Sequence, residues 1–299
     1  FEVGRFADAK AGYDALLAYP YMADRGEMYW IILYDRGRIA EREGRRGEAI
    51  RFYEKAVEVI EQQRATISIE AGKIGFVGDK QAVYARLITL LVEDGQQAKA
   101  FEYVERSKSR ALVDLLAGKK DFVVRETGRE EQVRQALAAA DRSEAELLAL
   151  DKNLNKSRTR GIAIRAKEDL QKEAPELASL VSVAATPASE IRSFLARGET
   201  LVEYYYTDAD LLVFILSANG LQSAKLPLAG LADDVAAFRR ALENPRSRET
   251  AGFAARLHQR LFKPLETALS ARQLVLVPHG ILHYIPFNAL YDGKNFLID

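Results

Sequence analysis

An internal repeat constrains the fold of residues 1–120 more than any other feature. Between residues 33 and 61 the chain reads LYDRGRIAEREGRRGEAIRFYEKAVEVIE, with small and aromatic residues spaced as in two antiparallel helices joined by a glycine turn. Small residues let the two helices approach closely, and a turn glycine adopts backbone angles that other residues resist. The positions are Leu33, Gly37, Ala40, Gly44, Ala49, Tyr53 and Ala56; a second copy aligns through Tyr84, Leu87, Leu91, Gly95, Ala100 and Val104, and a partial copy through Gly4, Ala9, Tyr13 and Leu16.

This pattern resembles tetratricopeptide repeats (TPRs), whose helix pairs stack into a solenoid with a concave face. The turn glycines lie 40 and 51 residues apart, which is longer than the repeat unit of about 34 residues, so we expect inserted helix or loop around residues 67–80. The resemblance implies that a protein or peptide partner binds the concave face. The inward positions of the middle copy would be Ile31, Tyr34, Arg38 and Glu41. Alternatively, these four residues pack against a neighbouring inserted helix.

Residues 121–185 predict a charged helical hairpin that connects the repeats to the rest of the chain. Apolar residues follow helical spacing from Val133 to Leu154, and Arg160-Gly161 interrupts the pattern before a second helical segment. The bend contains several lysines and arginines, but no aromatic residues for base stacking lie between them. A solvated helix face explains these charges better than a nucleic-acid site.

Composition excludes several classes of function. Lys+Arg and Asp+Glu both number 43, so no net field attracts nucleic acid or anionic lipid, and no apolar run is long enough to span a bilayer. The sequence has no cysteine and three histidines, which leaves few metal sites. We therefore expect no metal, no cofactor, no nucleic acid and no membrane. Because the chain begins with Phe1, we expect its native N-terminus to be missing; the compartment stays open, with the cytoplasm as the expectation.

The C-terminal part changes from helical to mixed patterning. Residues 200–207, 210–217 and 221–228 are rich in β-branched, aromatic and aliphatic residues and are separated by turn residues, which predicts consecutive antiparallel strands. Helices are expected over residues 229–243 and 249–269, followed by a strand of buried type in QLVLVP, residues 273–278. This order is typical of an α/β domain.

Two histidines, His279 and His283, follow that strand. A zinc peptidase would place both on one helix face, but Pro278, Gly280 and Pro286 make a continuous helix improbable, and no G-x-S-x-G elbow is present. We expect a structural role, in which a histidine bonds to the backbone and ties the turn to the sheet. An enzyme that uses His279 is the alternative.

The segment LVLVPHGILHYIPFNALYDGKNFLID, residues 274–299, resembles the opening of the CHAT domain, a caspase-like and separase-related domain found with TPRs. The resemblance rests on Pro278-His279-Gly280, Leu282-His283-Tyr284, Pro286-Phe287 with Ala289-Leu290, Asp292-Gly293 and Leu297-Ile298. It gives Pro278, His279, Gly280, His283, Pro286 and Phe287 a structural role as family-motif residues. Intact members are expected to be cysteine peptidases whose catalytic histidine and cysteine lie further C-terminal. No position here matches either, so the resemblance implies a fragment that ends early in the domain and has no catalytic residue.

The sequence thus predicts a mainly α protein with a C-terminal α/β part. We expect a TPR-like solenoid over residues 1–120, a helical hairpin over 121–185, and the incomplete N-terminal part of a caspase-like domain over 186–299. The expected function is a scaffold or regulatory portion of a caspase-like cysteine peptidase. A non-proteolytic TPR adaptor with a degenerate caspase-like domain remains the alternative. An open strand edge near Leu297 additionally predicts self-association.

Overall fold

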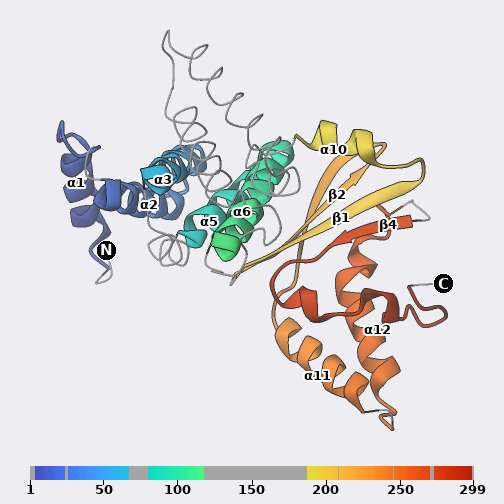
Figure 1. Ribbon diagram of the computed structural model, residues 1–299. Helices are drawn as coiled ribbons and strands as arrows, with labels where there is room; N and C mark the ends of the chain where they lie inside the picture. The colour runs from blue at the N-terminus through green and yellow to red at the C-terminus, as the bar shows by residue number, and fades with distance from the viewer. Residues whose placement is uncertain are drawn as a thin grey trace, which may run out of the picture. The chain divides into compact units, whose positions relative to one another are not determined.

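The computed structural model describes residues 4–23, 26–66, 80–117, 187–207, 209–244, 246–269 and 273–297 (Figure 1). The hairpin predicted over residues 121–185 lies outside these ranges, and so does the insertion predicted around residues 67–80, apart from Lys80. The chain divides into two compact units, of which the first comprises Phe1–Gly95 and Glu102–Ala185 and the second Gln96–Phe101 and Thr186–Asp299. The predicted fold class is confirmed, because the N-terminal part is helical and the C-terminal part combines helices with a mixed four-stranded sheet.

Helix pairs build the first unit. Its described helices are α1 (Phe6–Leu17), α2 (Gly26–Arg42), α3 (Arg46–Thr66), α5 (Gln81–Glu93) and, from Glu102 onward, α6 (Gln97–Ala117). The turn predicted at Gly44 is confirmed: Gly44 has φ +73°, its N–H donates to the Glu41 carbonyl, and the next N–H, of Arg45, donates to the Ala40 carbonyl at 2.8 Å. This pair of bonds ends α2 with a Schellman motif, which requires a residue in the left-handed region. Gly95 repeats the conformation between α5 and α6, with φ +75°.

The small residues of the repeat lie where α2 and α3 touch. Ala40, Ala49 and Ala56 have no exposed surface, and neither has the Tyr53 side chain. A Cβ atom added to Gly37 would lie 2.4 Å from Cε1 of Tyr53, well inside any carbon–carbon contact distance. Gly37 therefore sets how closely the two helices approach.

A four-stranded sheet forms the centre of the second unit, in the order β3-β2-β1-β4. Strands β1 (Glu199–Tyr206), β2 (Leu211–Ser217) and β3 (Gly220–Leu226) form the predicted antiparallel meander. Strand β4 (Gln273–Val277) joins the other side of β1 in parallel. Helix α10 (Ala188–Phe194) contacts β2, and α11 (Leu231–Glu243) and α12 (Thr250–Leu261) cover one face of the sheet (Figure 1).

Three details of the C-terminal prediction are wrong. The second helix ends at Leu261 rather than near residue 269, because Pro264 interrupts it and a short 3-10 turn, Lys263–Leu265, follows. Strand β4 is half-exposed at one edge of the sheet rather than buried. Leu297 lies in a turn after the isolated bridge between Tyr291 and Phe296, outside the described strands, whose two edges are β3 and β4.

Candidate functional site

The four residues predicted to bind a partner lie along one stripe of α2. Ile31 is exposed (43%), whereas Tyr34, Arg38 and Glu41 are half-buried. The rings of Tyr34 and the buried Tyr53 pack with centroids 5.7 Å apart. The same helix buries Trp30, Ile32, Leu33 and Ile39 on its other side. Ile31 is therefore the exposed part of the stripe, whereas Tyr34, Arg38 and Glu41 are partly covered.

Arg86 of α5 joins two residues of this stripe. Its Nε donates to the Tyr34 hydroxyl at 3.2 Å, and its Nη1 lies 3.1 Å and 3.3 Å from the two carboxylate oxygens of Glu41. Glu41 also accepts a 2.7 Å hydrogen bond from the Tyr53 hydroxyl. Burial raises the pKa of Tyr53 well above its usual range, and the bond to Glu41 raises it further. Tyr34 and Glu41 are thus held in fixed positions by a neighbouring helix.

Arg38 contacts Asp35 and the ring of Tyr34. Its Nη1 lies 3.1 Å from the Asp35 carboxylate, and its guanidinium lies 5.7 Å from the centre of the Tyr34 ring. Met28, one turn before Ile31, is also exposed (49%). We call Met28, Ile31, Tyr34, Arg38 and Arg86 the α2–α5 face.

Sequence reasoning missed Met28 and Arg86. Met28 precedes Ile31 by three residues and so extends the same stripe, a spacing that could have revealed it. The 51-residue offset between the turn glycines aligns Arg86 with Asp35 of the earlier copy, but that alignment gives no hint that Arg86 reaches Glu41. Both contacts of Arg86 arise from how α2 and α5 pack.

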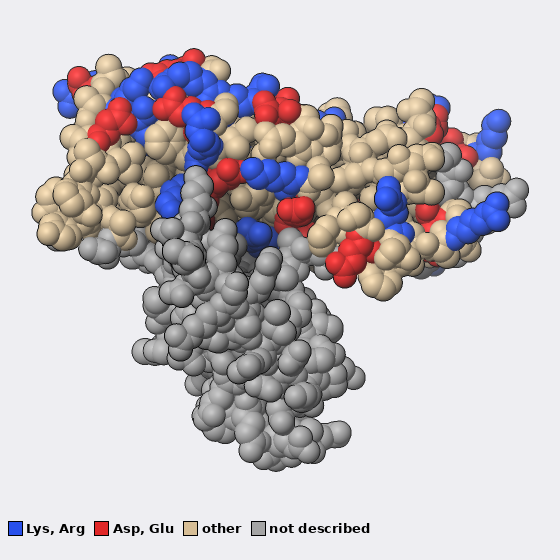
Figure 2. All heavy atoms as spheres, turned by 90° about the horizontal axis from the view of Figure 1, so that it is seen from above, with Lys and Arg blue, Asp and Glu red and all other residues tan. Residues whose placement is uncertain are grey.

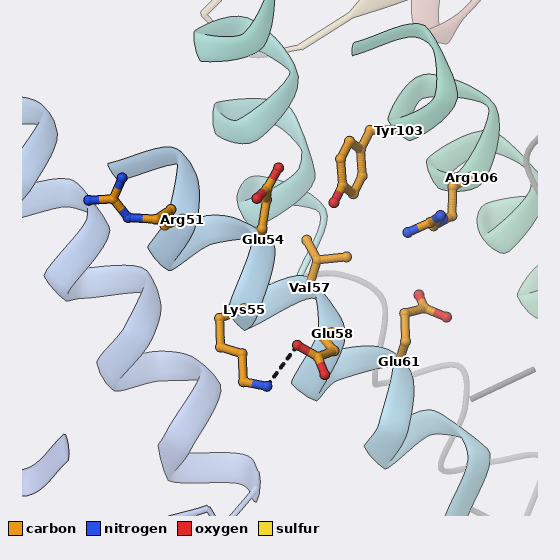
Figure 3. A pocket seen from close by; sticks show the side chains of 8 residues that line it. All are labelled: Arg51, Glu54, Lys55, Val57, Glu58, Glu61, Tyr103 and Arg106. Carbon is orange, nitrogen blue, oxygen red and sulfur yellow. Dashed lines mark hydrogen bonds and ion pairs between the residues drawn. The ribbon is translucent and has the colours of Figure 1, made fainter. Parts of the chain in front are cut away.

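A second feature of the first unit is a hollow of about 290 Å³ lined mainly by α3 and α6 (Figure 3). Figure 3 shows Arg51 at one end, Arg106 and Glu61 at the other, and Lys55 paired with Glu58 at 2.7 Å. Burial, with a contribution from Glu54, raises the pKa of Tyr103 to about 12. Three basic and three acidic side chains line the hollow, so their formal charges cancel: Arg51, Lys55 and Arg106 against Glu54, Glu58 and Glu61.

Charges of both signs are likewise interspersed over the described part of the face seen in Figure 2. Neither the hollow nor this surface provides the single-sign field that would concentrate phosphate or metal ions. Among the described residues, no group of three or more histidine or carboxylate side chains could hold a metal ion. No helix in the described part of the chain is long and apolar enough to cross a membrane.

In the second unit, His279 lies against the end of β1. Its Nδ1 is 3.0 Å from the backbone N of Tyr206 and 3.1 Å from the carbonyl oxygen of the same residue. The imidazole also stacks on the Tyr205 ring, with centroids 4.9 Å apart and planes within 7°. The contact joins residues 73 positions apart in the sequence. It ties the turn after β4 to the strand beside it.

Gly280 lies in the same turn after β4, close to Tyr206. It has φ +58°, and a Cβ atom there would lie 3.1 Å from Cδ1 of the Tyr206 ring. Both its backbone angle and its close approach to Tyr206 therefore favour glycine. The preceding Pro278 is half-buried and ends β4.

The rest of the motif separates into inward and outward residues. The Phe287 ring stacks on Tyr204 at 5.9 Å and meets Phe262 edge-on at 6.1 Å, next to the half-buried Pro286. His283, by contrast, is exposed on the short 3-10 helix Gly280–Tyr284. The two histidines thus lie in different surroundings, one against the sheet and one in solvent.

The third histidine, His258 of α12, was not singled out by sequence. It is 8% exposed, and its ring stacks on Phe262 at 5.6 Å. Burial lowers the pKa of His258, against raising contributions from Asp292 and Glu266. Asp292 itself is fixed in the hairpin turn, where its Oδ1 accepts hydrogen bonds from the backbone N–H groups of Lys294 and Asn295.

Comparison with known proteins gives one match. The family model of the CHAT domain matches residues 251–299, which contain α12 except its first residue, β4 and the whole Pro278–Phe287 motif. No curated protein and no solved structure matches the chain. The match supports a CHAT domain at the C-terminus and includes residues 274–299, whose motif carries the resemblance.

Proposed function

We propose that these 299 residues are the partner-binding and regulatory portion of a caspase-like cysteine peptidase. The helical unit, of TPR type, binds a protein or peptide on the α2–α5 face, and residues 186–299 supply the first part of the CHAT domain. Two findings support this proposal: the match of residues 251–299 to the CHAT family model, and the composition and exposure of the α2–α5 face.

The α2–α5 face is the observation that carries the proposal. It combines exposed aliphatic surface at Met28 and Ile31 with an aromatic ring and two guanidinium groups. Because Arg86 holds Tyr34 in place, the Tyr34 side chain loses little conformational entropy when a partner binds. Aromatic and arginine side chains beside apolar surface are the usual composition of binding hot spots in protein interfaces.

Peptide hydrolysis is not assigned to these residues. A cysteine peptidase needs a thiolate nucleophile, and none of the 299 residues is a cysteine. His279 has its Nδ1 within bonding distance of the Tyr206 backbone, which fits a role in holding the turn. The alternative, a non-proteolytic adaptor, would bind its partner on the same α2–α5 face, so the binding experiment below applies to both.

Phage display of random peptides on the purified chain, followed by fluorescence anisotropy, tests the proposal. Ile31→Asp should weaken selected peptides at least about tenfold, because burying one aliphatic side chain contributes about 1.5–3 kcal/mol. Leu242→Asp is the matched control, since Leu242 is an aliphatic helix residue with similar exposure (40%) in the other unit. Its affinities should equal those of the unmodified chain.

Two outcomes would contradict the proposal. If no displayed peptide binds the chain specifically, the helical unit is not a peptide-binding module. If Ile31→Asp and Leu242→Asp bind the selected peptides equally well, the site lies elsewhere on the molecule.

A further inference from the structure

Two side chains of the α2–α5 face carry hydrogen-bond donors that the described contacts do not use. The first is the guanidinium of Arg86, which has five N–H donors and keeps its charge at any ordinary pH. Its Nε donates to the Tyr34 hydroxyl, and its Nη1 lies within 3.3 Å of both carboxylate oxygens of Glu41. In the described part of the chain, no acceptor is bonded to Nη2. Arg86 therefore keeps two N–H groups that can bind another molecule.

The second donor is the hydroxyl group of Tyr34. A hydroxyl accepts through its lone pairs and donates its one proton. Because the Tyr34 hydroxyl accepts from Arg86, its proton points elsewhere, and the described contacts give that proton no acceptor. In a planar guanidinium one N–H of Nη2 is parallel to the Nε–H, which here points at the Tyr34 hydroxyl. The unused donors of the two side chains therefore lie side by side.

This pair of donors is open to solvent. The Arg86 side chain is 43% exposed, and Tyr34 is half-buried beside it. Helix α1 precedes α2 in the chain and α6 follows α5, so described helices flank both elements that carry the pair. A ligand can therefore reach the two donors from the surface of the helical unit.

A carboxylate matches these donors better than other protein groups do. It has two oxygens that only accept, and its hydrogen bonds to a guanidinium are shorter and stronger than those between neutral groups. A primary amide offers one acceptor oxygen and places its own N–H groups against the donors. A lysine or arginine of a partner would set donors against donors. The pair therefore selects for an acidic group.

The acidic side chains of the helical unit nearest to the pair are occupied elsewhere. Glu41 is bonded to Nη1 of Arg86 and to the Tyr53 hydroxyl. Asp35 pairs with Arg38 at 3.1 Å. Two guanidinium groups thus balance two carboxylates, so the face has no excess positive charge to attract anions from a distance. Recognition depends on where the donors lie, and we expect a weak dependence on salt.

We propose that the partner of the α2–α5 face presents an aspartate or glutamate side chain whose carboxylate accepts hydrogen bonds from the Tyr34 hydroxyl and from Nη2 of Arg86. A side-chain carboxylate extends away from its backbone and so reaches a half-buried hydroxyl, whereas a C-terminal carboxylate would bring the main chain with it. The inference rests on the proposed function, because it names the chemistry of the partner that binds this face.

The exposed aliphatic residues of the face set the position of the acidic residue in the partner. Met28 and Ile31 precede Tyr34 on α2 by about 9 Å and about 4.5 Å along the helix axis. In an extended peptide, residues i and i+2 point to the same side and lie about 6.6 Å apart. A peptide that places an aliphatic side chain on Met28 and Ile31 therefore brings the residue two positions away to Tyr34.

Fluorescence anisotropy with four pools of synthetic decapeptides tests the proposal. Three pools are acetylated and C-terminally amidated, with uncharged residues at the variable positions. Of these, two place leucine and glutamate two positions apart, one pool in each order, and the third replaces the glutamate by glutamine. The fourth pool has glutamine and a free C-terminal carboxylate. The better glutamate pool should bind the purified chain at least about tenfold more tightly than either glutamine pool, because its bonds are charge-assisted.

Two conservative variants locate the carboxylate. Tyr34→Phe removes the hydroxyl and keeps the ring, and Arg86→Lys keeps the charge and removes the planar pair of donors. Each should reduce the preference for glutamate over glutamine at least about threefold, while the affinity for the capped glutamine pool stays the same. A purely structural role would weaken both pools alike. Arg46→Lys is the matched control, because Arg46 has similar exposure (47%) and faces one carboxylate, Glu93; it should leave the preference intact.

The outcomes separate this inference from the proposed function. If leucine-containing pools bind and Ile31→Asp weakens them, but glutamate and glutamine bind equally, the acidic contact is overturned and the binding face stands. Tighter binding by the pool with a free C-terminus, or an unchanged glutamate preference in Arg86→Lys, overturns the acidic side chain in the same way. If no pool binds and phage display selects no peptide, both the inference and the proposed function are wrong.

Discussion

Gly37 lies in the interior of α2, where replacement by alanine would ordinarily strengthen a helix. Alanine is about 1 kcal/mol more favourable than glycine inside a helix because it restricts the unfolded chain. Here the added methyl group would lie 2.4 Å and 2.7 Å from two ring carbons of Tyr53. That ring is fully buried, and its hydroxyl is bonded to Glu41, so it has no room to withdraw.

The cost of the clash between the added methyl group and Tyr53 should therefore exceed the gain in helix propensity from alanine. Forcing an extra methyl group into a packed core costs about 1–3 kcal/mol. A contact this short belongs in the upper part of that range, so Gly37→Ala should destabilise the first unit by a net of about 1–2 kcal/mol. In urea this corresponds to a fall in the unfolding midpoint of about 0.5–1 M.

Fluorescence of Trp30 provides the assay. It is the single tryptophan in the sequence and lies 6% exposed in α2, the helix that carries Gly37. Gly12→Ala is the control, because Gly12 lies inside α1 with open space around its Cα. That variant should raise the midpoint slightly. In a Tyr53→Leu background, Gly37→Ala should lose its penalty, since the ring it strikes is gone.

An upward shift of the urea midpoint by Gly37→Ala, like that expected for Gly12→Ala, would contradict this prediction. Such a result would mean that α2 and α3 can separate at little cost.

Two further predictions concern the histidines of the second unit. Because burial lowers the pKa of His258, the unfolded chain binds the proton first, so stability should be retained above the ordinary histidine pKa of about 6.5 and fall as the pH drops below it. Thermal melts followed by circular dichroism should show this loss of stability at low pH. His258→Phe should reduce the loss, whereas His283→Gln, at an exposed position, should leave it unchanged. His279→Ala should cost about 1–2 kcal/mol in urea unfolding, from the lost bond to Tyr206 and the lost ring stack. If the purified chain cleaved a peptide substrate and His279→Ala removed that turnover, the structural role of His279 would be wrong.

Local features of the first unit could be predicted because they depend on residues close in the sequence. Gly44 and Gly95 mark turns that need a left-handed backbone, and both adopt it. Gly37 and the buried alanines were recognised as contact positions from their spacing alone. The β1–β2–β3 meander followed in the same way from alternating residues and short turns.

Pro264 carried a signal that the helix prediction overlooked. A proline cannot donate the backbone hydrogen bond that an α-helix interior requires, so the end of α12 near Leu261 was readable from sequence. The exposure of β4, by contrast, could not be read from the sequence. A short apolar run reads the same whether its strand lies in the middle of a sheet or at its edge, since only the neighbours differ.

The sequence by itself determined the helix pairs, the antiparallel meander and the C-terminal motif, because dihedral preferences, hydrophobic spacing and turn chemistry act over a few residues. Only the tertiary structure decided which distant groups meet: Arg86 with Tyr34 and Glu41, His279 with Tyr206, and β4 with β1. These contacts join residues 45 (Arg86 and Glu41) to 74 (Glu199 and Gln273) positions apart. Their formation depends on how whole elements pack, which no local pattern records.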